Sequence, residues 1–93
     1  MMYEHIGWCK EGKHDKVWGI IRLSDWDCVT FWGRRGTKLQ TKMIRAGKNV
    51  ANELFRKKTG HGYREIESWE LDTVYPEFEE DLKKTAIWAM LKL

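Results

Sequence analysis

The clearest fold signal in the sequence is a strand-like stretch that ends in a basic turn, Val29-Thr30-Phe31-Trp32-Gly33-Arg34-Arg35-Gly36. Successive residues of a β-strand point to opposite faces of a sheet, so Val29 and Phe31 share one face while Trp32 and Arg34 share the other. If the Val29 and Phe31 face packs against the core, Trp32 stands in solvent beside a planar cation. An exposed aromatic ring next to a guanidinium is typical of a binding surface.

Four strands are predicted in and around this stretch, separated by polar turns rich in glycine, serine and aspartate. They cover residues 5–10, 17–23, 28–34 and 38–44. The last strand carries Lys38, Gln40 and Lys42 on one side, which gives a polar and basic row. Whether this row shares a face with Trp32 depends on strand register, which the sequence leaves open.

One central helix is predicted over residues 48–59, followed by Gly60 as a natural stop. Its buried stripe comprises Val50, Ala51, Leu54 and Phe55. Residues 63–73 are predicted to add an extended segment with Ile66 and Leu71 turned inward, and the spacing of these two implies a bend or bulge between them.

A second helix is predicted over residues 75–93. Pro76 suits a first turn, the acidic residues after it oppose the helix dipole, and Lys92 lies near the end. The apolar stripe of this helix comprises Phe78, Leu82, Ala86, Ala89 and Leu93, widened by Ile87, Trp88, Met90 and Leu91. We expect it to pack on the same domain, because a small domain needs the extra buried area; the alternative is association with a partner or a second copy, as a homodimer.

The expected architecture is therefore α+β: a small antiparallel β-sheet with one central helix packed on it, plus a C-terminal helix. A chain of 93 residues with 42% hydrophobic content can bury a single core. We expect one domain over residues 1–74, with residues 75–93 as the amphipathic tail helix.

Charge is segregated along the chain. Residues 32–64 hold ten Lys or Arg and one Asp or Glu, whereas residues 65–93 hold three and eight. A basic block interleaved with aromatic residues is typical of a protein that binds a polyanion, and nucleic acid is the commonest polyanion in a cell. The alternative is a solvated basic face that the acidic tail partly neutralises.

Other function classes find little support in the sequence. No apolar run approaches the roughly 20 residues that cross a bilayer, and the N-terminus lacks the plan of a secretory signal, so we expect an intracellular, cytoplasmic protein without a membrane partner. The two cysteines, Cys9 and Cys28, are too few to form the disulfide framework of a small secreted domain. No catalytic motif is recognisable, and His5, Cys9 and His14 match no standard zinc spacing. The chain is expected to be neither an enzyme nor a metal- or cofactor-binding protein.

The signature Trp32-Gly33-Arg34 resembles that of the WGR domain, a family found in poly(ADP-ribose) polymerases and small bacterial proteins. Before it, residues 14–23 (HDKVWGIIRL) resemble the family's polar turn and aromatic-bearing strand. The positions after the signature that follow the family pattern are Gly36, Gln40, Ala51, Phe55, Lys58, Thr59, Gly62 and Tyr63. The resemblance spans residues 3–70.

Two positions depart from the family pattern, and both lie in the loop after Arg34. Arg35 stands where the family usually has a small aliphatic residue, and Leu39 replaces the second turn glycine. The shape of this loop therefore cannot be carried over from the family.

The resemblance implies a binding site. In related WGR domains the signature tryptophan packs against a sugar near a DNA strand end or nick, and the signature arginine engages the backbone or a neighbouring domain. It therefore implies stacking by Trp32, backbone or partner contact by Arg34, and close approach at Gly33, where a Cβ would interfere. Charge and proximity in sequence add further candidates for phosphate contact: Arg35, Lys38, Lys42, Arg56, Lys57, Lys58 and Arg64.

We expect a non-catalytic module that binds DNA ends, nicks or single strands with little sequence preference, and DNA rather than RNA. Two alternatives stay open. The polymerases relay DNA binding to a catalytic domain that these residues do not contain, so the Trp32 and Arg34 surface, or the apolar tail, could instead bind a protein partner in trans, as an interaction module or inhibitor. Trp32 could also be covered by the C-terminal helix, with Trp88 beside it.

Overall fold

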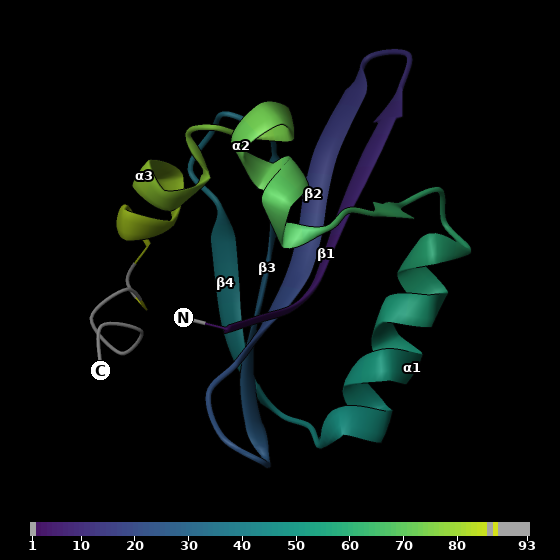
Figure 1. The fold of residues 1–93 in the computed structure, drawn as a ribbon, viewed down its shortest axis with the longest axis vertical. Coiled ribbons are helices and arrows are strands. Elements are labelled where there is room, and N and C mark those ends of the chain that lie inside the picture. Colours follow the sequence, from purple (N-terminus) through teal and green to yellow (C-terminus); the bar gives the residue numbers. More distant parts are fainter. Residues whose placement is uncertain (1, 86, 88–93) are drawn as a thin grey trace.

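A five-stranded antiparallel sheet in the order β4-β3-β2-β1-β5 forms the centre of the computed structural model, which describes residues 2–85 and 87 (Figure 1). The α+β architecture predicted from the sequence is confirmed. The strands are β1 (Met2–Glu11), β2 (His14–Arg22), β3 (Asp27–Arg34), β4 (Gln40–Arg45) and β5 (Arg64–Glu65). The helices are α1 (Lys48–Thr59), the 3₁₀ turn η1 (Ser68–Glu70), α2 (Leu71–Val74) and α3 (Phe78–Lys83).

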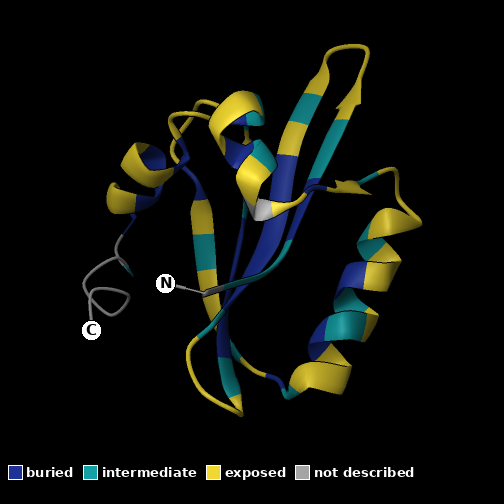
Figure 2. Ribbon diagram, in the orientation of Figure 1, coloured by how far each residue is buried: buried dark blue, intermediate teal, exposed yellow. Residues whose placement is uncertain are grey.

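Both faces of the sheet are covered. On one side, which we call the α1 face, α1 packs Ala51 and Phe55 onto the strands; this cluster comprises Trp18, Ile20, Cys28, Ala46, Ala51 and Phe55. On the other side, which we call the α3 face, α2 and α3 cover a larger cluster: Ile6, Val17, Ile21, Val29, Phe31, Leu39, Ile66, Leu71, Tyr75, Phe78 and Leu82. Because β3 lies between two layers, its residues 28–31 are buried in succession (Figure 2).

The four predicted strands are present, with shifted ends. β1 and β2 extend to a tight hairpin whose turn contains Gly12 at a φ of +58°, so Lys16 belongs to β2 and not to a turn. The register between β3 and β4 places Trp32 opposite Gln40 and Thr30 opposite Lys42. The polar row of β4 therefore shares a face with Trp32, which settles the point that the sequence leaves open.

Helix α1 occupies the predicted residues 48–59, but its buried stripe is narrower than predicted. Ala51 and Phe55 are buried and Leu54 is half-buried, whereas Val50 is 53% exposed. The helix ends before Gly60, which keeps a helical φ of −66°, and the chain turns at Gly62, where φ is +94°. The left-handed conformation that favours glycine is therefore adopted by Gly62, two residues after Gly60, the predicted helix stop.

The segment after α1 corrects the prediction of one extended run over residues 63–73. Within this run, only the two residues of β5 form a strand, which pairs with β1. The chain then coils into η1 and α2. Ile66 and Leu71 do point into the core, as predicted.

The tail also differs from the single helix predicted over residues 75–93. α3 begins at Phe78 and ends at Lys83, and the chain continues as a turn at Lys84 and a bend at Thr85. Phe78 and Leu82 are buried in the α3-face cluster and Ile87 packs against it. The other stripe positions, Ala86, Trp88, Ala89, Met90, Leu91 and Leu93, lie outside the described residues, as does Lys92. Among the helices that are described, none is long and apolar enough to cross a bilayer.

Candidate nucleic-acid interface

Trp32 is half-buried rather than free in solvent, which corrects the first expectation. It packs against the cluster beneath α1, directly opposite Trp18 on β2. The physical reason is that α1 covers the face that was expected to be open, while α2 and α3 cover the Val29 and Phe31 face. The alternative was that the C-terminal helix covers Trp32. The described part of that segment, α3, lies on the opposite face of the sheet, and Trp88 is outside the described residues.

Beyond α1, the α1 face is accessible at the Trp32 and Arg34 end of β3 and along part of β4. The helix packs mainly across β1 and β2, on one side of the sheet (Figure 1). Arg34, Gln40 and Lys42 are exposed on this face, and Trp32 lies among them. We call Lys16, Trp32, Arg34, Lys42 and Lys58 together the Trp32 surface.

Lys16 and Arg34 form a like-charged pair at one end of the Trp32 surface. They lie directly opposite each other on β2 and β3, and both are exposed. Arg34 donates from Nη1 to the backbone oxygen of Lys13 over 3.1 Å, but within residues 2–85 no carboxylate lies at ion-pair distance from Lys16 or Arg34. Like charges directly opposite each other on a sheet are destabilising, so an anion between them would relieve repulsion. This pair has the chemistry of a phosphate site.

The C-terminal end of α1 borders the Trp32 surface on the side of β2. Nζ of Lys58 lies 5.5 Å from the ring centroid of Trp18, a cation–π geometry that holds this half-buried lysine beside the sheet. Lys57 is exposed. Arg56 is paired with Glu53 at 3.0 Å and lies one turn after Asn52, which contacts His5 of β1, so Arg56 faces away from Trp32.

Arg35 does not belong to the Trp32 surface, although it follows Arg34 in the chain. Its Nε and Nη2 donate to Oδ2 of Asp15 over 3.1 and 2.8 Å, and its Nη1 donates to the backbone oxygen of Val74. Its guanidinium also lies 5.1 Å from the ring centroid of Trp8. Arg35 therefore fastens the loop after β3 to the end of α2, and its guanidinium is engaged within the protein in this structure.

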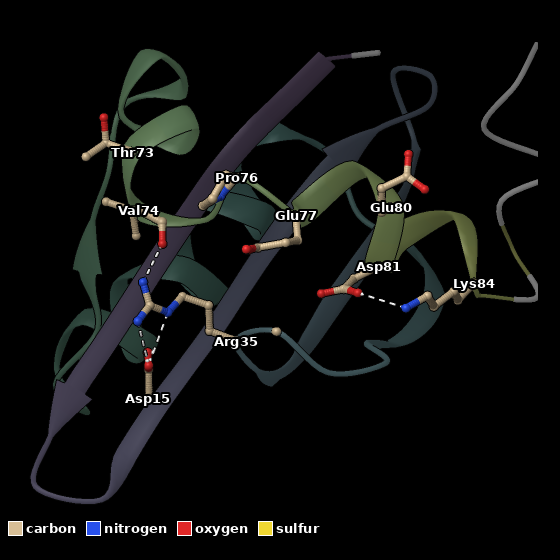
Figure 3. Close-up of a pocket in the computed structure, with 10 residues that line it drawn as sticks. Asp15, Arg35, Thr73, Val74, Pro76, Glu77, Glu80, Asp81 and Lys84 are labelled. Carbon is tan, nitrogen blue, oxygen red and sulfur yellow. Dashed lines mark hydrogen bonds and ion pairs between the residues drawn. The ribbon is translucent and has the colours of Figure 1, made fainter.

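Figure 3 shows this tether at the edge of a hollow of about 640 Å³ on the α3 side. The residues that line it are Asp15, Arg35, Gly36, Thr73, Val74, Pro76, Glu77, Glu80, Asp81 and Lys84. Asp81 is buried there. It accepts a hydrogen bond from the hydroxyl of Tyr75 and forms an ion pair with Lys84 at 3.3 Å. With four carboxylates and two cations, this hollow has the opposite charge from the Trp32 surface.

Asp15 at this tether gives a pH-dependent prediction. Burial by itself would raise the pKa of Asp15, but hydrogen bonds from Trp8 and Arg35 outweigh it and hold the pKa below its ordinary value. A lowered pKa in the folded state means stability that is present above the unfolded pKa of about 4 and is lost as pH falls through the folded value. Asp15→Asn should lower the free energy of unfolding by about 2 kcal/mol at pH 7, in urea denaturation.

The difference between Asp15→Asn and wild type should shrink as the pH falls below about 4 and through the lowered pKa of the folded state, since the wild-type carboxyl loses its charge over that range. Glu11→Gln, at an exposed position of the same hairpin, is the control and should change little. A difference that stays constant between pH 7 and pH 3 would contradict a role for the carboxylate charge.

Three further candidates are not counted in the Trp32 surface. A Cβ on Gly33 would lie 3.5 Å from Leu39, on the α3 face, and its φ of +149° favours glycine there. Arg64 lies across from Trp8, 5.9 Å from that ring, and pairs with Glu70 at 3.5 Å. Lys38 is exposed in the loop before β4.

The structure thus brings together Trp32, Arg34, Lys42 and Lys58 from the predicted set and adds Lys16. Lys16 was missed because residues 11–16 look like a polar turn. The signal that could have found it is alternation: positions 16, 18 and 20 share one face, as positions 32 and 34 do. Among the described residues no three His, Cys, Asp or Glu side chains gather as a metal site requires.

Comparisons with known proteins add no relative. No protein-family model, no curated protein and no solved structure matches this chain.

Proposed function

We propose that this chain is a nucleic-acid-binding module of the WGR type, acting on DNA ends, nicks or single strands with little sequence preference. The observation that supports the proposal best is the Trp32 surface, where an aromatic ring lies between an unneutralised pair of cations and Lys42. Strands β3 and β4 place no acidic side chain on this face. A nucleic-acid partner also fits the intracellular location expected from the sequence.

The two components of the surface would act differently. The cations neutralise phosphates and release counterions, which gives affinity that falls steeply with salt and carries little sequence information. The ring of Trp32 stacks on a base or sugar, worth on the order of 1–3 kcal/mol for each base. Because Trp18 and the α1 cluster support Trp32 from the side, its ring is held in place before a ligand arrives.

The test is a fluorescence-anisotropy titration of labelled single-stranded, nicked and blunt DNA at 50 and 200 mM salt. Wild type should bind, and affinity should fall at the higher salt. Trp32→Ala should weaken binding by about 5- to 150-fold, whereas Trp32→Phe keeps a ring and should retain most of the affinity. Trp69→Ala, at an exposed tryptophan in η1, is the matched control and should bind like wild type.

Thermal melting of each variant shows whether it is folded, since Trp32 is half-buried. No binding by folded wild type at 50 mM salt would contradict the proposal. Binding to a protein partner that is insensitive to salt would favour the alternative of an interaction module, because an apolar interface does not respond to ionic strength as phosphate contacts do.

A further inference from the structure

Trp26 is exposed without an evident structural need. It lies in the turn between β2 and β3, and its side chain is 62% exposed. The ring lies against the start of α1, since a Cβ on Gly47 would lie 3.2 Å from it. Beside the ring is a hollow of about 340 Å³. The residues that line this hollow are Asp25, Trp26, Gly47, Lys48, Asn49 and Val50.

The backbone around Trp26 is fixed rather than loose. The amides of Leu23 and Ser24 donate to the oxygen of Asp27 over 2.9 and 3.1 Å, which closes the turn. The amide of Ala46 donates to the oxygen of Trp26 over 2.8 Å, which ties the turn to the segment before α1. An exposed ring on a fixed backbone loses little conformational freedom when a planar group stacks on it.

Trp26 also lies in line with the Trp32 surface. Along β3 the α1 face carries Arg34, Trp32, Thr30 and Cys28 in turn, and the chain reaches Trp26 just before the strand begins. Thr30 and Cys28 are buried, so Lys42 of β4, which lies opposite Thr30 and is exposed, forms the accessible step between the two rings. The exposed groups are therefore the Lys16 and Arg34 pair, Trp32, Lys42, and then Trp26 with Lys48. Asp25 is the one acidic residue among those that line the hollow beside Trp26.

The length of this track sets the size of a ligand. Six residues separate Trp32 from Trp26, or roughly 20 Å at the rise of a β-strand. A stacked nucleic-acid strand advances about 3.4 Å per nucleotide, so roughly six nucleotides cover the distance between the two rings, and fewer if the strand is extended. Alternating rings and cations over such a length are typical of proteins that bind single strands.

We propose that Trp26 is a second stacking platform, so that the protein holds a single strand of about six nucleotides along β3. The strand runs from the Lys16 and Arg34 pair, past Trp32 and Lys42, to Trp26. This inference rests on the proposed function and narrows it: continuous single strands, rather than the terminus of a duplex, are the ligand that fills the whole track.

The experiment is a length series of labelled oligothymidylates, of three, six and nine nucleotides, titrated at 50 mM salt by fluorescence anisotropy. Wild type should gain affinity from three to six nucleotides and little from six to nine. Trp26→Ala should bind six nucleotides about 5- to 150-fold more weakly than wild type, the range for one lost stacked base, and should lose the gain with length. Trp32→Ala should instead be weakened at every length.

Two controls keep the outcomes distinct. Trp26→Phe keeps a ring and should preserve the dependence on length, and Trp69→Ala removes a tryptophan that is 76% exposed elsewhere and should match wild type. If Trp26→Ala matches wild type at every length while Trp32→Ala is weakened, the second platform is wrong and the proposed function stands. If folded wild type binds none of these oligonucleotides and no nicked or blunt DNA, the proposed function fails as well.

Discussion

Replacing Lys16 and Arg34 together by glutamate is expected to weaken binding of a single-stranded oligonucleotide at least a hundredfold at 50 mM salt. The two side chains lie opposite each other on β2 and β3, and no carboxylate among the described residues is at ion-pair distance from either, so the change turns a paired cationic site into a paired anionic one. For single strands, each lost phosphate contact should also reduce the slope of log K against log salt by about 0.7.

The matched control is Lys10→Glu. Lys10 lies on the neighbouring strand β1, opposite Asp15, and forms only a loose ion pair with it at 3.8 Å. It belongs to the other face of the sheet, so the change should lower affinity only slightly through net charge. Equal losses in Lys10→Glu and in the double variant would show that total charge, and not the Trp32 surface, governs binding.

Gly19→Ala is expected to destabilise the fold by about 3 kcal/mol, as an overpacked core does. Gly19 lies in the centre of β2, where an added Cβ would approach the backbone oxygen of His5 to 2.6 Å and the ring of Phe31 even more closely. Phe31 is fully buried and cannot swing away, and the oxygen of His5 belongs to the neighbouring strand. For a domain of this size, we expect a fall in melting temperature of roughly 12–24 °C.

Gly60→Ala is the matched control, because it makes the same chemical change at a position with a φ of −66° and no contact closer than 3.4 Å. It should leave the melting temperature unchanged or raise it slightly. If Gly19→Ala had the same melting temperature as Gly60→Ala, the close contact between Phe31 and Gly19 of β2 would be contradicted.

The sheet and α1 could be predicted from the sequence because each element carries its own local signal. Strands β1 to β4 have β-branched and aromatic runs between polar turns, and α1 has apolar residues at helical spacing. The tail could not be predicted in the same way. Its pattern favours one long helix, yet Phe78 and Leu82 dock into the core and the helix ends soon after them, because tertiary packing overrides propensity.

For the candidate site, the sequence indicates the types of residue, an aromatic ring and cations, better than it indicates how they are arranged. Alternation correctly separates Trp32 from Phe31, but it cannot show that α1 and α3 cover opposite faces. For the same reason it cannot separate Arg34, on the Trp32 surface, from Arg35, which binds Asp15 behind it. Neighbouring positions in a basic loop look alike in sequence, and only register and loop geometry divide them.

The opposite charges of the two faces have a consequence for how copies of this protein would share one strand. If the Trp32 surface lies on a polyanion, the hollow lined by Glu77, Glu80 and Asp81 points outward. A bound molecule would then present carboxylates to any second strand that approached. On the proposed function, the protein would coat a nucleic acid without crosslinking it, because a molecule bound to one strand would repel the next.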